Sequence, residues 1–128
     1  MKENTIKALM IEPKKTPCKC TLTNELSELQ KAVSIGAENV GLIEIINLSP
    51  DVCLLCNEEG KLIGLEPNRR LGNDIVCGVF YLTGQDKEGN LASLPDRAME
   101  FYSSYFSTPD VIDPSEVESR IFMHFEEI

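Results

Sequence analysis

The sequence has few of the residues and motifs on which enzymes and nucleic-acid-binding proteins depend. It contains one histidine, His124, with no serine or cysteine nearby in a recognisable nucleophile setting, so a catalytic triad is not expected. It has neither a Gly-x-Gly-x-x-Gly fingerprint nor a phosphate-binding loop ending in Gly-Lys-Ser/Thr. Lysine and arginine number 12 against 21 acidic residues, which argues against direct nucleic-acid binding. We therefore expect a protein that is not an enzyme and has no catalytic residue.

Long hydrophobic runs are also missing. The apolar run after residues 1–5 is too short for the hydrophobic region of a signal peptide and far too short for a membrane span. The five cysteines are an odd number without a secretory signal, which favours reduced thiols over a disulfide framework. These features predict a soluble, cytoplasmic protein with no membrane partner.

Acidic residues are plentiful, and they concentrate at the carboxyl end. Residues 1–50 carry six basic and six acidic side chains, residues 51–95 carry four and seven, and residues 96–128 carry two and eight. The simpler interpretation is a solvated face that keeps the protein soluble. The alternatives are a surface for a basic partner or, if the carboxylates are densely arrayed, a mimic of DNA.

The central stretch, residues 51–84, is expected to be the middle of a sheet. Its strands are rich in β-branched, aromatic and thiol residues, which fit a buried pleated surface, and Gly, Asn and Asp bound them. The pattern predicts a strand at 52–56, a tight turn at 57–60, a polar-rimmed loop at 64–70 and a second strand at 75–83.

A hairpin and a helix are expected before this stretch. A strand at 6–12 is stopped by a proline and pairs with a short strand at 18–22. Thr23 or Asn24 can cap a helix that ends at Gly36, where glycine tolerates the left-handed conformation. The apolar stripe of this helix comprises Leu26, Leu29, Val33 and Ile35.

The fold class follows from how the strands are linked. The apolar run at 40–48 predicts a third strand, and residues 49–51 join it to the strand at 52–56. So short a link requires an antiparallel pair, because a parallel pair needs a crossover of about a dozen residues. We expect an α+β fold: residues 1–128 as a single domain, with a mostly antiparallel sheet of about five strands and two to three helices covering one face.

Helices are expected in the carboxyl-terminal third. Residues 93–96 read as a capping box that begins a helix at 94–106, and residues 113–116 repeat this logic for a terminal segment. In that segment the apolar spacing favours a helix over an edge strand. An aromatic stripe on the first of these helices is expected in the core: Leu94, Ala98, Phe101, Tyr102 and Tyr105.

The cysteines offer a possible zinc cluster that strand geometry disfavours. Cys18 and Cys20 form a Cys-x-Cys pair, and Cys53 and Cys56 form a Cys-x-x-Cys pair. Residues three apart in a regular strand point to opposite faces, so Cys53 and Cys56 cannot both bind one ion. We expect packed thiols, no metal site and no cofactor.

One polar constellation stands out, at residues 66–70. Adjacent Arg69 and Arg70 follow Asn68 and Glu66 in an acidic chain, and they could clamp a carboxylate or phosphate of a partner or small ligand. Alternatively, the arginines hold the loop over the sheet by pairing with acidic neighbours. The neighbours expected for this structural role are Glu58, Glu59 and Asp74.

A resemblance to a known family is carried by four segments: NEEGKL at 57–62, GL at 64–65, PNR at 67–69 and CGVFYLTG at 77–84. Together with the first strand, first helix and later helix, they resemble the family called domain of unknown function 3846. The likeness covers the chain to about residue 107 and leaves residues 108–128 as an acidic, helical extension. The resemblance implies an accessory role in phages, plasmids or bacteria, where such domains sometimes lie near antirestriction modules. The family has no assigned activity.

Three functions remain open. The first is a non-enzymatic interaction module whose partner is an unknown protein, working through the loop at Asn68, Arg69 and Arg70 or through the acidic carboxyl-terminal face. The second is a protein that sequesters a small anionic ligand or nucleotide in a pocket through the two arginines. The third is an acidic DNA mimic that acts in counter-defence.

Overall fold

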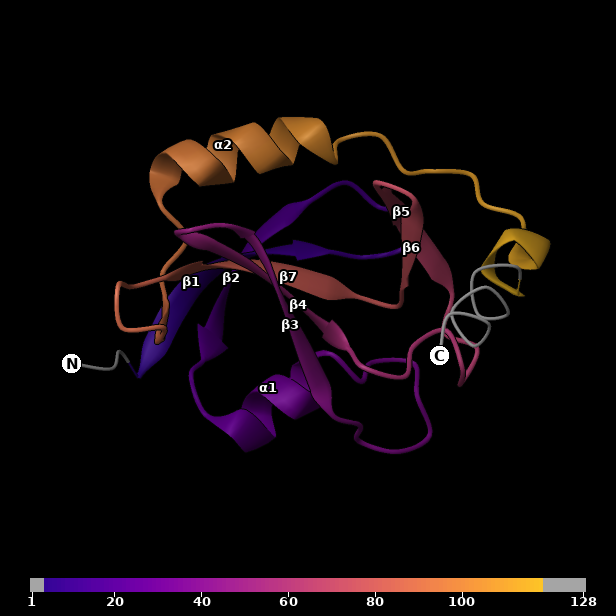
Figure 1. Cartoon of the computed structure of the whole chain (residues 1–128), viewed down its shortest axis with the longest axis horizontal. Helices are drawn as coiled ribbons and strands as arrows, with labels where there is room; N and C mark the ends of the chain where they lie inside the picture. The colour runs from indigo at the N-terminus through magenta and orange to yellow at the C-terminus, as the bar shows by residue number, and fades with distance from the viewer. Residues whose placement is uncertain (1–3, 119–128) are drawn as a thin grey trace.

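All paired strands are antiparallel in the computed structural model, which describes residues 4–118 (Figure 1). Six strands form one sheet in the order β2-β1-β7-β4-β3, with β8 pairing to β7, and β5 and β6 form a separate hairpin. The strands are β1 (Thr5–Ile11), β2 (Cys18–Thr23), β3 (Ile43–Ser49), β4 (Val52–Asn57), β5 (Pro67–Leu71), β6 (Asp74–Cys77), β7 (Phe80–Gln85) and β8 (Leu91–Ala92). The helices are α1 (Leu26–Ala32), α2 (Asp96–Tyr105) and a short turn at 114–118. The predicted α+β class with a mostly antiparallel sheet is confirmed.

The predicted central stretch does supply the middle of the sheet. β7 lies between β1 and β4, with Leu82 opposite Leu9 on one side and opposite Leu54 on the other. Every residue of β4 is buried, because the sheet is covered on both faces. β3 is an edge strand, and Glu44, Ile45 and Asn47 on it are exposed.

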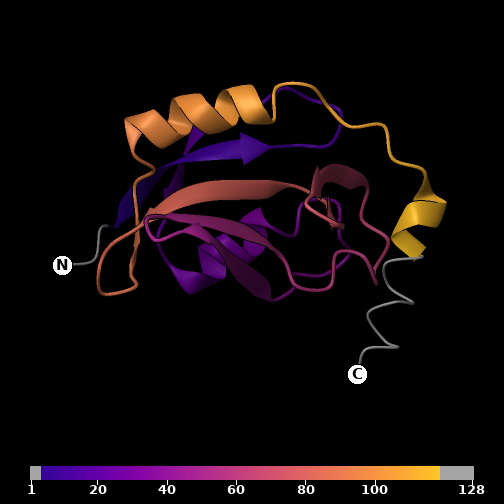
Figure 2. The ribbon, with the colours of Figure 1, turned by 45° about the horizontal axis from the view of Figure 1, so that its top comes forward.

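Helices cover both faces of the sheet, and the expectation of one covered face is wrong. Alternate residues of β4 point in opposite directions, as the two-residue period of a strand requires. Leu54 packs in the cluster under α2 with Met99, whereas Leu55 packs in the cluster under α1 with Leu29. Figure 2 shows α2 and α1 on opposite sides of the sheet.

Two features of the predicted central stretch need correction. The segment expected to be a loop at 64–70 contains most of a strand, β5. The strand expected at 75–83 is divided into β6 and β7 at Gly78, whose φ of 82° is incompatible with a continuous strand. The chain therefore turns out of the main sheet and forms the β5–β6 hairpin beside it.

The first helix forms where the apolar stripe predicts it, although only part of the stripe is buried. Leu29 and Val33 are buried, whereas Leu26 and Ile35 are exposed. The helix ends at Ala32, and Gly36, with φ of 89°, turns the chain a few residues later. The cap position is occupied by Glu25 without a side-chain hydrogen bond, so the predicted Thr23 or Asn24 cap is wrong.

Only part of the stripe expected on the second helix faces the core: Leu94 is buried, and Ala98 and Tyr102 pack against the core cluster. Phe101 and Tyr105 are exposed, whereas Met99 and, directly after the helix, Phe106 are buried. The predicted capping box is also wrong, because no side chain caps this helix. Ser93 Oγ instead accepts a hydrogen bond of 2.9 Å from the backbone N–H of Lys7 in β1.

No helix within residues 4–118 is long and apolar enough to cross a membrane. The predicted terminal helix is present at 114–118, where Val117 is buried. The remainder of that prediction, residues 119–128 with His124, lies outside the described residues.

Candidate functional site

Three of the four predicted site residues lie on β5, and Glu66 directly precedes it. The register of the β5–β6 hairpin shifts between Pro67 and Arg69, so Asn68 is the extra residue of a β-bulge. A regular strand would turn neighbouring side chains to opposite faces. The bulge instead buries Asn68 and Arg69 together and leaves Arg70 at the surface.

The Asn68 side chain joins the hairpin to the main sheet. Its Nδ2 donates to the backbone oxygens of Ile11 and Gly78, both at 2.8 Å, and its Oδ1 accepts from Arg69. Ile11 ends β1, and Gly78 lies between β6 and β7. Asn68 therefore has a structural role at the point where the two sheets meet.

Arg69 is only 1% exposed, and its guanidinium makes five hydrogen bonds. Nε and Nη2 donate to Phe106 O at 3.3 and 3.0 Å, and Nη2 also reaches Lys15 O at 2.6 Å. Nη1 donates to both oxygens of Asn68, at 3.2 and 2.8 Å. An arginine has five N–H donors, so all of them are committed to holding the hairpin, the turn after β1 and the end of α2.

The electrostatics of Arg69 agree with this interior position. Burial lowers the pKa of its guanidinium, and the nearby carboxylate of Asp110 acts in the opposite direction. The direct acceptors are all neutral oxygens. The structure thus places Arg69 where a bound anion could reach it only after the hairpin moves.

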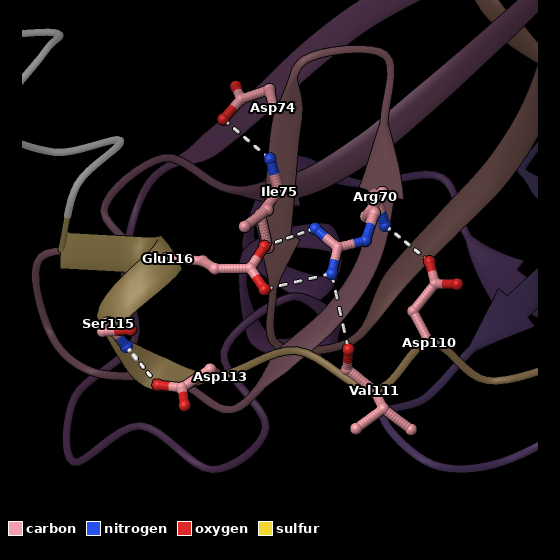
Figure 3. Close-up of polar contacts among 8 residues, drawn as sticks. All are labelled: Arg70, Asp74, Ile75, Asp110, Val111, Asp113, Ser115 and Glu116. Atoms are coloured by element: carbon pink, nitrogen blue, oxygen red, sulfur yellow. Dashed lines mark hydrogen bonds and ion pairs between the residues drawn. The ribbon is translucent and has the colours of Figure 1, made fainter.

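Arg70 points outward and binds the segment that follows α2 (Figure 3). Both terminal nitrogens of its guanidinium bond the Glu116 carboxylate, and Nη2 also donates to Val111 O at 3.4 Å. The backbone N–H of Arg70 donates to Asp110 Oδ2 at 2.8 Å. The hydrogen bond with Glu116 raises the pKa of Arg70. The chain itself therefore supplies the carboxylate that this arginine binds.

Glu66 forms a surface ion pair with Lys14, Nζ to Oε1 at 2.9 Å. This hydrogen bond raises the pKa of Lys14. Glu66 does not join Arg70 around one ligand position, because its carboxylate is turned toward the β1–β2 turn. Asp74, expected to pair with an arginine, instead pairs with Lys61.

A cavity of about 290 Å³ lies between the β3–β4 pair and the β5–β6 hairpin. Cys56 lines it, and its Sγ lies 3.7 Å from Glu44 Oε1. Burial, reinforced by Glu44, raises the pKa of the Cys56 thiol to about 12. Carboxylates outnumber cations on the walls, where Lys61 is paired with Asp74. The lining includes Glu44, Ile46, Glu58, Glu59, Leu62, Leu71 and Val76.

Sequence reasoning missed this cavity. Its one visible signal was Glu44, a charge that interrupts the apolar run of the third strand. Glu44 and Asp74 are far apart in the chain, and only the hairpin's position beside the sheet brings them to one cavity. No local sequence pattern predicts that these two residues meet at one cavity.

The cysteines are distributed as strand geometry predicts. Cys53 packs under α1 and Cys56 under α2, on opposite faces of the sheet. Cys18, on β2, is exposed, so the expectation of packed thiols is wrong there, and Cys20 is partly buried. Within residues 4–118 no group of three or more His, Cys, Asp or Glu side chains is placed to hold a metal ion.

Large apolar side chains are exposed in the turn that follows β4 and in the segment between α1 and β3. Residues 36–41 and Ile63 line a shallow hollow, and Glu58 N donates to Leu42 O at 2.9 Å, so the two segments lie together. We call the exposed side chains of this region the apolar rim: Ile35, Val40, Leu42, Leu62 and Ile63, each between 48% and 60% exposed.

Neither the curated proteins nor the solved structures give a match. Residues 6–107 match the family described as Domain of unknown function (DUF3846), and this stretch contains the sheet except Thr5, the β5–β6 hairpin, the cavity and the apolar rim. The segment that Arg70 grips, beginning at Asp110, lies beyond the matched residues. Since the match covers most of its length, the chain belongs to this family of unknown function.

Proposed function

We propose that the chain is a non-enzymatic interaction module and that a partner protein docks on the apolar rim. The observation that carries this proposal is that two segments that lie together, residues 35–42 and the turn after β4, expose five large apolar side chains. Contiguous apolar surface rimmed by polar groups is typical of protein–protein contact sites, because it gains free energy when water is excluded.

The neighbouring cavity extends the same surface. Leu62 belongs to the rim and also lines the cavity, whose walls carry several carboxylates. A partner that covers the rim would bring its own side chains to the mouth of this cavity. An apolar patch beside such an indentation is the arrangement in which buried anchor residues of partners contribute most of the binding energy.

An accessory role in a phage, plasmid or other mobile element is part of this proposal, and it comes from the family resemblance alone. We also propose a cytoplasmic location. All five thiols are free, which supports a reducing compartment.

The rim can be tested with matched substitutions. Leu42→Asp and Ile63→Asp together place two charges in the rim, while Leu26→Asp places one on α1 at 61% exposure. Each tagged chain is expressed in its own host, cross-linked and purified, after circular dichroism confirms the fold. We expect the rim variant to lose at least about 90% of a partner that the Leu26 variant retains, since charges oppose desolvation of the contact. Equal recovery by both variants would refute docking at the rim.

Small-ligand capture is a second candidate, favoured by the cavity. The excess of carboxylates around Glu44 supports a cationic ligand, whereas Arg70 supports an anionic one. Thermal shifts with a panel of amines and nucleotides separate the cationic from the anionic ligand, because a ligand that binds only the folded chain raises the melting temperature of the protein. A rise abolished by Glu44→Gln identifies the cavity, and one abolished by Arg70→Ala identifies the arginine. No rise with any compound would count against ligand capture.

A further inference from the structure

The β5–β6 hairpin binds an acidic segment of its own chain. We call residues 110–117 the strap. They follow an irregular stretch that leaves α2 and crosses to the hairpin, as Figures 1 and 2 both show. The family match ends at residue 107, so the hairpin is part of the family domain and the strap is not. The receiving surface and its occupant therefore belong to different parts of the chain.

Two carboxylates of the strap bind one residue of the hairpin. Asp110 accepts the backbone N–H of Arg70, and Glu116 accepts from both terminal nitrogens of its guanidinium (Figure 3). A two-pronged pairing of arginine with carboxylate is stronger and more directional than a single hydrogen bond. Val111 adds a backbone carbonyl to the same guanidinium.

Apolar contacts accompany these hydrogen bonds to Arg70. Val117 directly follows Glu116 and is only 8% exposed, packed in a cluster with Leu65, Ile75 and Cys77. Ile112 is partly buried against the same cluster, whereas Val111 is 95% exposed. The strap thus contacts the hairpin through selected side chains, as a bound peptide does.

We propose that this hairpin surface is a binding site for an acidic segment of a partner protein, in which an apolar residue follows the carboxylate that pairs with Arg70. The strap occupies the site in cis and must leave before the partner enters. A short tether holds a segment at an effective concentration on the order of millimolar, so the strap excludes weak competitors. This proposal goes beyond docking at the apolar rim, because it uses a different surface and a partner of stated charge.

The test uses the full chain with the strap released. Glu116→Lys and Val117→Asp together remove its ion pair and its apolar contact, and a synthetic peptide with the sequence of residues 108–118 is added in trans. Binding is followed by the NMR shifts of the β5 and β6 amides. We expect the released variant to bind with half-saturation near or below about 0.1 mM, and the wild-type chain about tenfold more weakly, because the tethered strap competes at an effective concentration of about 1 mM.

Two controls identify the contacts. Adding Arg70→Met to the released variant should weaken peptide binding about two- to fivefold, and so should replacing the peptide's glutamate by glutamine, because the ion pair is partly exposed. Leu42→Asp with Ile63→Asp, in the rim, should leave the peptide affinity unchanged, so failure of one proposal does not imply failure of the other.

Two results would overturn the proposal. One is a folded released variant whose hairpin amides do not respond to several millimolar peptide, and the other is equal binding after Arg70→Met. If the released variant does not fold, Glu116→Gln replaces it. This milder variant should bind the peptide more tightly than the wild-type chain does, and no gain over the wild type would equally refute the proposal.

Discussion

At the scale of single residues, Arg69 shows how a charged side chain becomes part of a protein interior. Burying a guanidinium is unfavourable unless its donors are satisfied, and here neutral oxygens from three places in the chain satisfy them. The same bonds hold Phe106 after α2 and Lys15 after β1. Removing the side chain would leave these buried carbonyls without their donor.

Arg69→Met is therefore expected to lower the free energy of unfolding by about 2–4 kcal/mol. Arg70→Met, at the neighbouring exposed position, is expected to cost less than about 1 kcal/mol, since exposed ion pairs contribute little. Urea unfolding followed by circular dichroism measures both. Similar losses in the two variants would show that burial does not distinguish the two arginines.

The pair of arginines also shows what the sequence could and could not supply. Two adjacent cations in an acidic chain made this segment stand out, and Arg70 holds a carboxylate of its own chain. Their different roles were invisible because the segment read as a loop, in which neighbouring side chains have no fixed directions. The β-bulge at Asn68 decides which arginine faces inward, and it depends on pairing with β6.

At the scale of elements, the break between β6 and β7 sets the position of the hairpin. Gly78 has φ of 82°, and its N–H donates to Glu66 O at 2.7 Å. A Cβ built there would lie 2.7 Å from Cδ1 of Leu65, too close for the side chain to stay in place. Both the backbone conformation and the available space therefore require glycine.

Gly78→Ala should destabilise the chain by more than Gly64→Ala. Gly64 has a similar φ of 76° but nothing within 4 Å of its built Cβ, so alanine there adds only backbone strain of about 1–2 kcal/mol. At Gly78 the clash with Leu65 should add at least about 1 kcal/mol. Thermal melts of both variants provide the comparison, and equal losses would mean that Leu65 moves aside without cost.

The orientation of helix α2 predicts which aromatic residues support the fold. Phe106 is 3% exposed and packs edge-on against Phe80 with ring centroids 5.4 Å apart, whereas Phe101 is 59% exposed. Phe106→Ala should cost about 3–5 kcal/mol, since it opens a cavity under the helix. Phe101→Ala should cost less than about 1 kcal/mol. A larger loss from Phe101→Ala, in urea titrations, would reverse the assigned orientation of the helix.

The elements that the sequence predicted well are those with one clear apolar pattern. The first hairpin, α1 and β4 each have a single apolar pattern bounded by turn residues. The stripe expected on α2 was partly wrong because apolar residues occupy two faces: Phe101 and Tyr105 on one, Met99 and Phe106 on the other. Helical spacing fits both sets equally, and only the sheet beneath decides between them.

At the scale of the whole molecule, a sheet covered on both faces leaves little room for polar groups inside. Thiols and one phenol are among the groups that the interior accepts: Cys53 and Cys56 on opposite faces, and Tyr81, whose hydroxyl donates to Ala32 O at 3.1 Å. Such groups are neutral at pH 7 and become costly only when they ionise. The sequence predicted thiols packed in the interior but not which face each would occupy.

This burial makes the folded state sensitive to alkali. Burial raises the pKa of Cys56 and of Tyr81 to about 12 each, from ordinary values of 9.0 and 10.0. At pH values between the ordinary and the raised pKa, the unfolded chain loses protons that the folded chain keeps. The stability that these groups contribute is therefore fully present below about pH 9 and falls as the pH rises. Cys56 alone contributes a slope of up to about 1.4 kcal/mol per pH unit, and Cys56→Ala should remove that share.

Urea unfolding under reducing conditions at several pH values from 7.5 to about 11 measures the slope, with alanine at exposed Cys18 as the control. Stability that stays constant across this range, or a slope that Cys56→Ala leaves unchanged, would mean that the buried thiol ionises as readily as in the unfolded chain.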